Sequence, residues 1–197
     1  MNKKRVIVVC PGRGSYTRET SNYLSNSLPE MDEYLKTFDS KRVNENLLKI
    51  SELDKTTFRS KTHMTGENAS PLIYACSLND FISINKNKYD VVAICGNSMG
   101  WYISLAIGNA ITFENGYDII QTMGMITNEQ GEGGQIIYPI IDSEWNIDPK
   151  KKMMVLEAID NTNAFISIYL GGYIVIGGEQ KALDFLIKEL PSEDKYP

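Results

Sequence analysis

The 197-residue sequence contains one histidine, His63, and three cysteines, Cys10, Cys76 and Cys95. The cysteines are odd in number, lack CxxC spacing and stand among apolar residues. This pattern excludes a disulfide framework and a zinc site, and it predicts buried thiols in a reducing cytoplasm. No apolar run approaches the roughly 20 residues that cross a bilayer, so a membrane-spanning protein is excluded. The first apolar run stops at Cys10, short of the roughly 7 to 15 residues in the core of a signal peptide.

Basic residues are also in the minority. Twenty Lys and Arg against 25 Asp and Glu give a net charge of -5 and a pI near 5.0. The sequence lacks the basic stripe that binding to a phosphate backbone needs, so we expect no nucleic-acid partner. Asp80, Asp90, Asp118 and Asp142 occur singly, without the spacing of metal ligands, so we expect no metal. Apolar residues make up 42% of the chain, enough for a globular core.

The first two-thirds of the chain has an α/β pattern. Residues 4–10 and 89–95 are β-branched runs typical of fully buried strands in a parallel sheet. Between them, apolar spacing predicts two helices over 17–50, separated at Pro29. A buried helix is predicted over 70–84, with Ser70 as its N-cap and Pro71 at its first position. Further helices are predicted over 99–109 and 117–128.

A GEGG loop at 131–134 precedes a different pattern. Strands are predicted at 135–141, 164–170 and 173–177, and helices at 149–160 and 179–190. This β-α-β-β-α order is that of a ferredoxin-like lobe without its last strand. We therefore predict an α/β protein with two domains: an α/β hydrolase-like core with a parallel sheet over 1–132, and a small, incomplete ferredoxin-like subdomain over 133–197.

Residues 96–100, Gly-Asn-Ser-Met-Gly, match the Gly-x-Ser-x-Gly pattern between a strand and a helix. The glycines are needed at this tight turn because a Cβ at either position would collide with neighbouring backbone. Ser98 would then stand exposed at a helix N-terminus, where the helix dipole and the Met99 N–H stabilise an oxyanion. The alternative is an ordinary turn in which Ser98 caps the helix.

A second glycine-rich turn, Pro-Gly-Arg-Gly-Ser at 11–15, follows the first strand. In an α/β hydrolase-like sheet this turn supplies another backbone N–H to the oxyanion hole, here that of Arg13. A simple turn and an anion-binding nest that uses Arg13 are the alternatives.

These motifs occur in a recognisable order: PGRGS, ASPLIYACS, GNSMGWY, the helix ending in IIQTMG, and GGQ before the small lobe. The order resembles the acyl-carrier-protein S-malonyltransferase family and the acyltransferase domains of polyketide synthases. That family's signatures are PGQGSQ, TQPAL, GHSLGEY and a Leu-Val-x-x-Arg-Gly helix. The resemblance covers essentially this whole chain, and about the first two-thirds of a usual family member.

The resemblance implies an acyltransferase of fatty acid or polyketide biosynthesis. Ser98 would be the nucleophile that takes an acyl group from a coenzyme A or carrier thioester. The N–H groups of Met99 and Arg13 would form the oxyanion hole, and the phosphopantetheine thiol of an acyl carrier protein would attack the acyl-serine. The expected partners are therefore an acyl carrier protein and a small acyl thioester, with no further cofactor.

The chain departs from the family pattern beside the nucleophile. Asn97 stands where the family has His, Trp101 where it has Glu, and Ser70 where it has Gln. Met123 aligns with the Arg that grips the malonyl carboxylate, and an uncharged thioether cannot pair with that anion. These four positions are the predicted substrate-binding residues, and the acyl group is predicted to be other than malonyl.

The general base is also missing from its expected place. The family's catalytic His follows the small lobe, and this chain ends before that segment. By the resemblance, His63 lies in a surface loop, KTHMTGEN, as a solvated side chain. A catalytically degenerate module that binds a carrier protein or an acyl chain is therefore the alternative function. A small serine hydrolase is less favoured, because no Asp-His pair follows Ser98.

Overall fold

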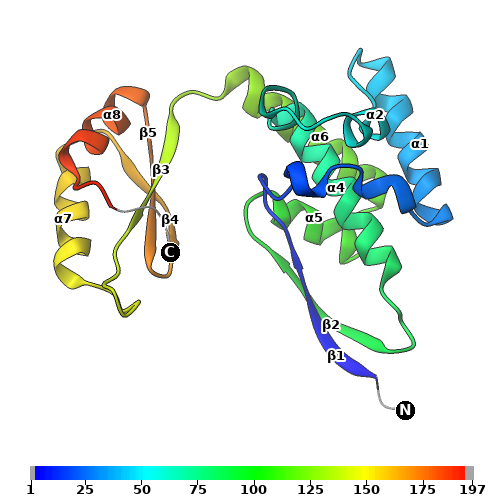
Figure 1. Cartoon of the computed structure of the whole chain (residues 1–197), viewed down its shortest axis with the longest axis horizontal. Coiled ribbons are helices and arrows are strands. Elements are labelled where there is room, and N and C mark those ends of the chain that lie inside the picture. The colour runs from blue at the N-terminus through cyan, green and yellow to red at the C-terminus, as the bar shows by residue number, and fades with distance from the viewer. Residues whose placement is uncertain (1–2, 194–197) are drawn as a thin grey trace. The chain divides into compact units, whose positions relative to one another are not determined.

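The computed structural model describes residues 3–193 of this mixed α/β protein. The chain forms two compact units, one up to Gln130 and one from Gly131. The first unit contains a parallel pair of strands with helices packed on it, and the second contains an antiparallel sheet with two helices (Figure 1). Within the described residues, no helix combines the length and apolarity that a bilayer crossing requires.

The sheet of the first unit consists of β1 (Lys4–Cys10) and β2 (Tyr89–Gly96), which pair in parallel. The positions and pairing of these strands agree with the sequence prediction. The prediction of full burial is wrong, because Ile7 is 62% and Val9 73% exposed. Only alternate side chains of the two strands face the core. Cys95 pairs with Val9 and is exposed with it, so the prediction of three buried thiols is wrong at this position. Cys10 is buried as predicted, and Cys76 is half-buried.

Six helical segments connect β1 to β2: η1 (Arg18–Thr20), η2 (Tyr23–Asn26), α1 (Pro29–Asn44), α2 (Ile50–Lys55), α3 (Ser60–His63) and α4 (Gly66–Ser83). The helix predicted before Pro29 is thus two short 3-10 turns. The carboxylate of Asp54 accepts hydrogen bonds from the backbone N–H groups of Tyr23 and Leu24, both at 2.9 Å. This buried carboxylate holds η2 against α2.

Helix α4 begins at Gly66, four residues before the predicted start, and its N-cap is Thr65. Pro71 therefore lies inside the helix, where its ring nitrogen cannot donate to the carbonyl of Glu67. That carbonyl instead accepts hydrogen bonds from Arg42 Nη1 at 2.8 Å and Gln121 Nε2 at 3.3 Å. Buried side chains of two other helices thus replace the bond that the proline cannot make.

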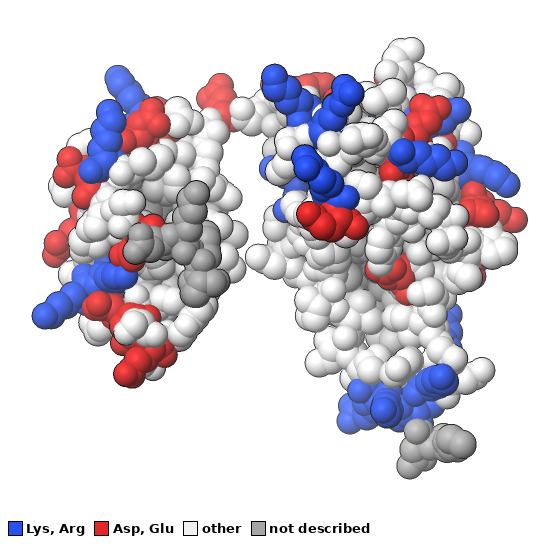
Figure 2. Space-filling model, in the orientation of Figure 1, with Lys and Arg blue, Asp and Glu red and all other residues white. Residues whose placement is uncertain are grey.

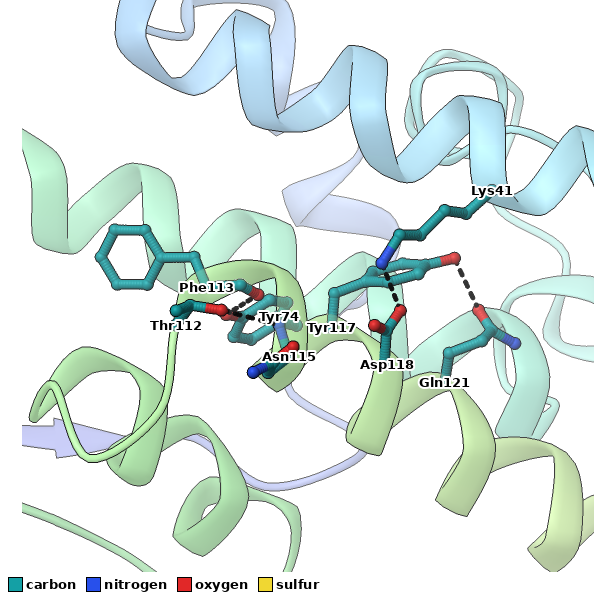
Figure 3. A network of polar contacts seen from close by, with 8 residues as sticks. All are labelled: Lys41, Tyr74, Thr112, Phe113, Asn115, Tyr117, Asp118 and Gln121. Atoms are coloured by element: carbon teal, nitrogen blue, oxygen red, sulfur yellow. Dashed lines mark hydrogen bonds and ion pairs between the residues drawn. The ribbon is translucent and has the colours of Figure 1, made fainter.

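Helices α5 (Met99–Ile107) and α6 (Phe113–Gln130) complete the first unit. Figure 3 shows how polar contacts hold α6 in place: Lys41 of α1 pairs with Asp118 at 2.5 Å, and the Tyr74 hydroxyl of α4 donates to the Phe113 carbonyl at 2.8 Å. The core between these helices includes Met31, Phe38, Leu72, Tyr74, Ile103, Tyr117 and Ile120. The position of α6 is therefore fixed by both α1 and α4.

The second unit contains β3 (Gly134–Pro139), α7 (Pro149–Asp160), β4 (Phe165–Leu170), β5 (Tyr173–Gly178) and α8 (Gln180–Glu189). The elements follow the predicted β-α-β-β-α order, and the sheet is antiparallel with strand order β3-β5-β4. Both helices lie on one face of this sheet (Figure 1), over a core that includes Ile174, Ile176, Val155 and Leu186.

Candidate active site

Ser98 lies at the junction of β2 and α5 with φ 54° and ψ -127°. Residues with a side chain rarely adopt a positive φ. The Ser98 side chain is exposed and accepts no hydrogen bond from the first turn of α5. The capping alternative is therefore wrong, and the hydroxyl of Ser98 is not engaged by the helix that it precedes.

The two glycines of the motif make close backbone contacts. A Cβ on Gly96 would meet the carbonyl of Gly100. A Cβ on Gly100 would meet the carbonyl oxygen of Cys10 and would lie 2.9 Å from that of Pro11. The predicted collisions with backbone are confirmed at both positions. The first turn of α5 therefore packs directly on the carboxyl end of β1.

The same contacts place the glycine-rich turn after β1 beside Ser98. A Cβ on Gly12 would lie 3.8 Å from the carbonyl oxygen of Asn97, and Arg13 lines a cavity together with Ser98. Met99 is the first residue of α5, so its N–H has no acceptor within that helix. The oxyanion-hole roles of the Arg13 and Met99 N–H groups stay predictions.

The cavity beside Ser98 has a volume of about 330 Å³. Six of the seven predicted site residues line it: Arg13, Ser70, Ser98, Met99, Trp101 and Met123. Asn97 is exposed but lies outside this lining, and its carbonyl accepts a hydrogen bond from the Gly100 N–H at 2.9 Å. Segments distant in the sequence, from the turn after β1 to α6, thus meet at one hollow.

One face of α6 forms a wall of this cavity through Ile120, Met123, Gly124 and Thr127. Their spacing of three and four residues places them on the same side of the helix, and this pattern is readable in the sequence although only Met123 was predicted. Gly124 lies against α4: its Cβ would meet the Gly66 carbonyl and would lie 3.1 Å from Ser70 Oγ. This close crossing brings the buried Ser70 to the cavity.

The lining is mainly apolar and carries one charged side chain, that of Arg13. Trp101 is 54% exposed, and its ring meets that of Tyr102 edge-on at a centroid distance of 5.3 Å. Within residues 3–193, no His, Asp or Glu lines this cavity. The described lining therefore provides a serine hydroxyl and a cation, but no His, Asp or Glu that could act as a general base.

His63 lies elsewhere, and the prediction of a solvated surface side chain is wrong. The ring is 2% exposed and stacks on Tyr16 at a centroid distance of 6.2 Å. Its Nδ1 lies 3.1 Å from the Arg59 backbone nitrogen, and its Nε2 lies 3.0 Å from the Leu53 carbonyl oxygen. The polar segment folds into the short helix α3, which turns the ring into the core. Both ring nitrogens are occupied by these contacts.

One cluster of positive charge in the first unit lies far from Ser98. Figure 2 shows Lys and Arg side chains gathered at the amino end of the β1–β2 pair, where Lys4, Arg5 and Lys88 are exposed. Ser98 follows the carboxyl end of β2, and a strand of this length spans roughly 20 Å. Among the described residues that line the cavity, Arg13 is the one cation. In the described part of the chain, no cluster of three or more His, Cys, Asp or Glu is suited to a metal.

Neither a protein-family model nor a curated protein matches the sequence. Solved structures do match its fold. The malonyl-CoA:ACP transacylase of Synechocystis sp. PCC 6803 matches with a TM-score of 0.73 at 16% identity, over 96% of this chain and 60% of its own. The acyltransferase domain of the polyketide synthase PpsC of Mycobacterium tuberculosis matches with a TM-score of 0.68 at 17% identity, over 95% of this chain and 54% of its own.

A malonyl-transacylase in complex with its type II polyketide synthase acyl carrier protein matches with a TM-score of 0.71 at 17% identity, over 95% of this chain and 59% of its own. The chain thus has the fold of malonyl-CoA:ACP transacylases and polyketide synthase acyltransferase domains over nearly its whole length. It spans 54% to 60% of the length of these three structures. At these identities the likeness establishes the fold.

Proposed function

We propose that the protein is an acyltransferase that carries an acyl group on Ser98 between a coenzyme A or carrier thioester and an acyl carrier protein. The observation that carries the proposal is the strained, exposed Ser98 at the start of α5, in a cavity shared with Arg13 and Met99. Strain of this kind is typical of nucleophiles held at a strand-to-helix turn. The fold shared with malonyl-CoA:ACP transacylases supports the same reaction.

In the proposed reaction, Ser98 Oγ attacks the thioester carbonyl carbon and the C–S bond breaks. The carbonyl oxygen carries the negative charge toward the N–H groups of Met99 and Arg13. The serine proton passes to the departing thiolate, and an acyl-serine ester forms. The phosphopantetheine thiol then attacks this ester, releases Ser98 and returns the proton to its oxygen.

The proposed partner and the proposed acyl group rest on two different observations. A malonyl-transacylase of this fold binds its acyl carrier protein in a solved complex, which supports a carrier protein as the acceptor. Met123 lines the cavity as an uncharged thioether, which supports an acyl group other than malonyl. We further propose that residues 1–132 form an α/β hydrolase-like core and residues 133–197 a ferredoxin-like subdomain. The proposed context is fatty acid or polyketide synthesis.

Acylation of Ser98 tests the proposal. After incubation with a panel of acyl-CoA thioesters, mass spectrometry is expected to find one acyl group on the peptide that contains Ser98. The reaction is expected to be slow, because an oxyanion hole without a base leaves a rate only about 10³- to 10⁴-fold above that in water. Ser98→Ala abolishes the label, whereas Ser104→Ala, on the next turns of α5, keeps it. A label that persists in Ser98→Ala contradicts the proposal.

A catalytically degenerate binding module is the second candidate, and the lack of a general base in the described lining favours it. This candidate predicts that the chain binds a carrier protein, and that no thioester assay detects acyl transfer. It also predicts that a fluorophosphonate probe leaves Ser98 unmodified, because a serine without activation is a poor nucleophile. Acyl transfer to a carrier protein would reject it.

A further inference from the structure

Arg13 borders two cavities. One contains Ser98, and the other, of about 380 Å³, is lined by Arg13, Tyr16, His63 and Gly66 among others. Thr127 of α6 also lines both. Arg13 therefore lies between two cavities of the first unit, and one of these cavities contains the proposed nucleophile.

The charge of Arg13 is not balanced by the protein. Among residues 3–193, no ion pair or hydrogen bond engages its guanidinium, and no Asp or Glu lines either cavity. Its Nη1 lies 3.3 Å from where a Cβ on Gly66 would be, at the amino end of the 18-residue helix α4. The helix dipole adds positive potential there. Glu67, the next residue of α4, lines neither cavity.

Arg13 is exposed at the border of both cavities, so an anion can reach its unpaired guanidinium, and a carboxylate matches its fork of donors. We propose that Arg13 is a specificity-determining residue that binds a carboxylate at the far end of the acyl group. This inference rests on the proposed acyltransferase function. It means that the apolar Met123 does not make the site selective for neutral acyl chains, because the cation is supplied by the turn after β1.

The reach of the same residue gives an upper limit to the spacing of the two groups that it is proposed to bind. Its N–H is the proposed oxyanion donor for the thioester carbonyl, and its guanidinium is the proposed carboxylate donor. With bonds of about 1.5 Å, an extended arginine side chain spans up to about 7 Å from Cα. Malonyl has one carbon between its two carbonyl groups, so the two carbonyl carbons lie about 2.5 Å apart. A longer dicarboxylic acid, such as glutaric acid, matches the spacing better, so we expect a glutaryl-type monothioester.

Selectivity between matched acyl groups is the first test. N-acetylcysteamine thioesters carry no phosphate, so glutaryl, malonyl and pentanoyl thioesters differ only in the acyl group. Ser98 is expected to be acylated at least ~10-fold faster by glutaryl than by pentanoyl or malonyl, the size of one partly exposed charge-assisted hydrogen bond. Arg13→Gln removes this preference. Arg18→Gln is the control, because it removes the same charge from an exposed residue that lines neither cavity. This variant is expected to retain the preference for the glutaryl thioester.

Equal rates for glutaryl and pentanoyl, or a preference that survives in Arg13→Gln, would overturn the inference while acylation itself still supports the acyltransferase. A preference for coenzyme A thioesters that depends on Arg13 but not on the acyl group would also overturn it, because the bound anion would then be a phosphate.

Binding separates the two proposals. In Ser98→Ala, calorimetry compares unreactive amide analogues of the glutaryl and pentanoyl thioesters. The glutaryl analogue is expected to bind at least ~10-fold more tightly, and Arg13→Gln to abolish the difference. If this preference is found but no thioester acylates Ser98, the acyltransferase proposal fails and the carboxylate site stands. If both analogues bind equally, the carboxylate site is rejected.

Discussion

Ser98 keeps its hydroxyl exposed at a conformational cost. A positive φ at a non-glycine residue costs of order 1–3 kcal/mol, which the surrounding contacts must offset. These contacts are backbone to backbone: Gly96 against Gly100, and Gly100 against the last residue of β1. The strain at the proposed nucleophile is therefore sustained by two positions at which any side chain would separate the strand from the helix.

Substitution by alanine should affect stability differently at Gly100, where a Cβ would collide with backbone, and at Gly12, where a Cβ has room. Gly100→Ala is expected to lower the free energy of unfolding by about 3 kcal/mol, because the Cys10 carbonyl cannot move without separating α5 from β1. Gly12→Ala is the matched control, since its Cβ would make an ordinary 3.8 Å contact with the Asn97 carbonyl oxygen. It is expected to cost less than about 0.5 kcal/mol. Urea denaturation measures both, and equal losses would contradict this account.

Helices α1, α4 and α6 are joined by one buried arginine. Arg42 is fully buried and bonds to the carbonyls of Leu48 and Glu67, to Gln121 Oε1 at 2.6 Å and to Asn68 Oδ1 at 2.5 Å. Burial lowers the pKa of Arg42. The hydrogen bonds that its N–H groups donate fix the position of the side chain. Since α4 and α6 provide Ser70 and Met123, this cluster positions two walls of the cavity.

Arg42→Met is expected to destabilise the protein by about 3 kcal/mol, because it leaves the buried Asn68 Oδ1 without its Arg42 donor and removes one of two donors from both Gln121 Oε1 and the Glu67 carbonyl. Arg59→Met removes the same charge from an exposed position and is expected to cost less than about 0.5 kcal/mol. Pro71→Ala restores an N–H that can reach the Glu67 carbonyl, and should recover about 1 kcal/mol in the Arg42→Met background. Thermal and urea denaturation measure the cycle. Strictly additive effects would show that the arginine does not replace the proline's missing bond.

Over the whole molecule, the two units have separate cores. In the first unit, several titratable groups are buried without charge. Burial, with a smaller effect of Cys95, raises the pKa of the Cys10 thiol from 9.0 to about 11. Burial also raises the pKa of Cys76, Tyr74 and Tyr117 above their usual range. The folded chain thus favours the protonated form of each group.

Stability is therefore expected to fall in alkaline solution. The unfolded chain releases these protons first, so it binds fewer protons than the folded chain as the pH rises above 9. The contribution of Cys10 is fully present below pH 9 and is lost as the pH rises through about 11. The urea midpoint should decrease between pH 8 and 11, and Cys10→Ala should make the decrease shallower. A midpoint that is constant over this range would contradict the prediction.

The amino-acid sequence by itself determined the features that depend on neighbours along the chain. The bounds of β1, the start of α7 at Pro149 and the glycine requirement around Ser98 follow from local patterns, because side-chain shape and backbone freedom act over a few residues. Tertiary structure decided what depends on distant partners. His63 became buried because Tyr16 and Leu53 receive its ring, and Val9 stayed exposed because only one face of the strand pair meets the core.

The same division applies to the candidate site. Six of its residues carry motif or resemblance signals, but the second cavity at Arg13 and the early start of α4 have none. Pro71 locally favours a helix start, and only the donors of Arg42 and Gln121 from other helices allow the helix to begin earlier. A pattern along the chain specifies which groups are present, whereas burial and charge balance depend on which groups the fold brings against them.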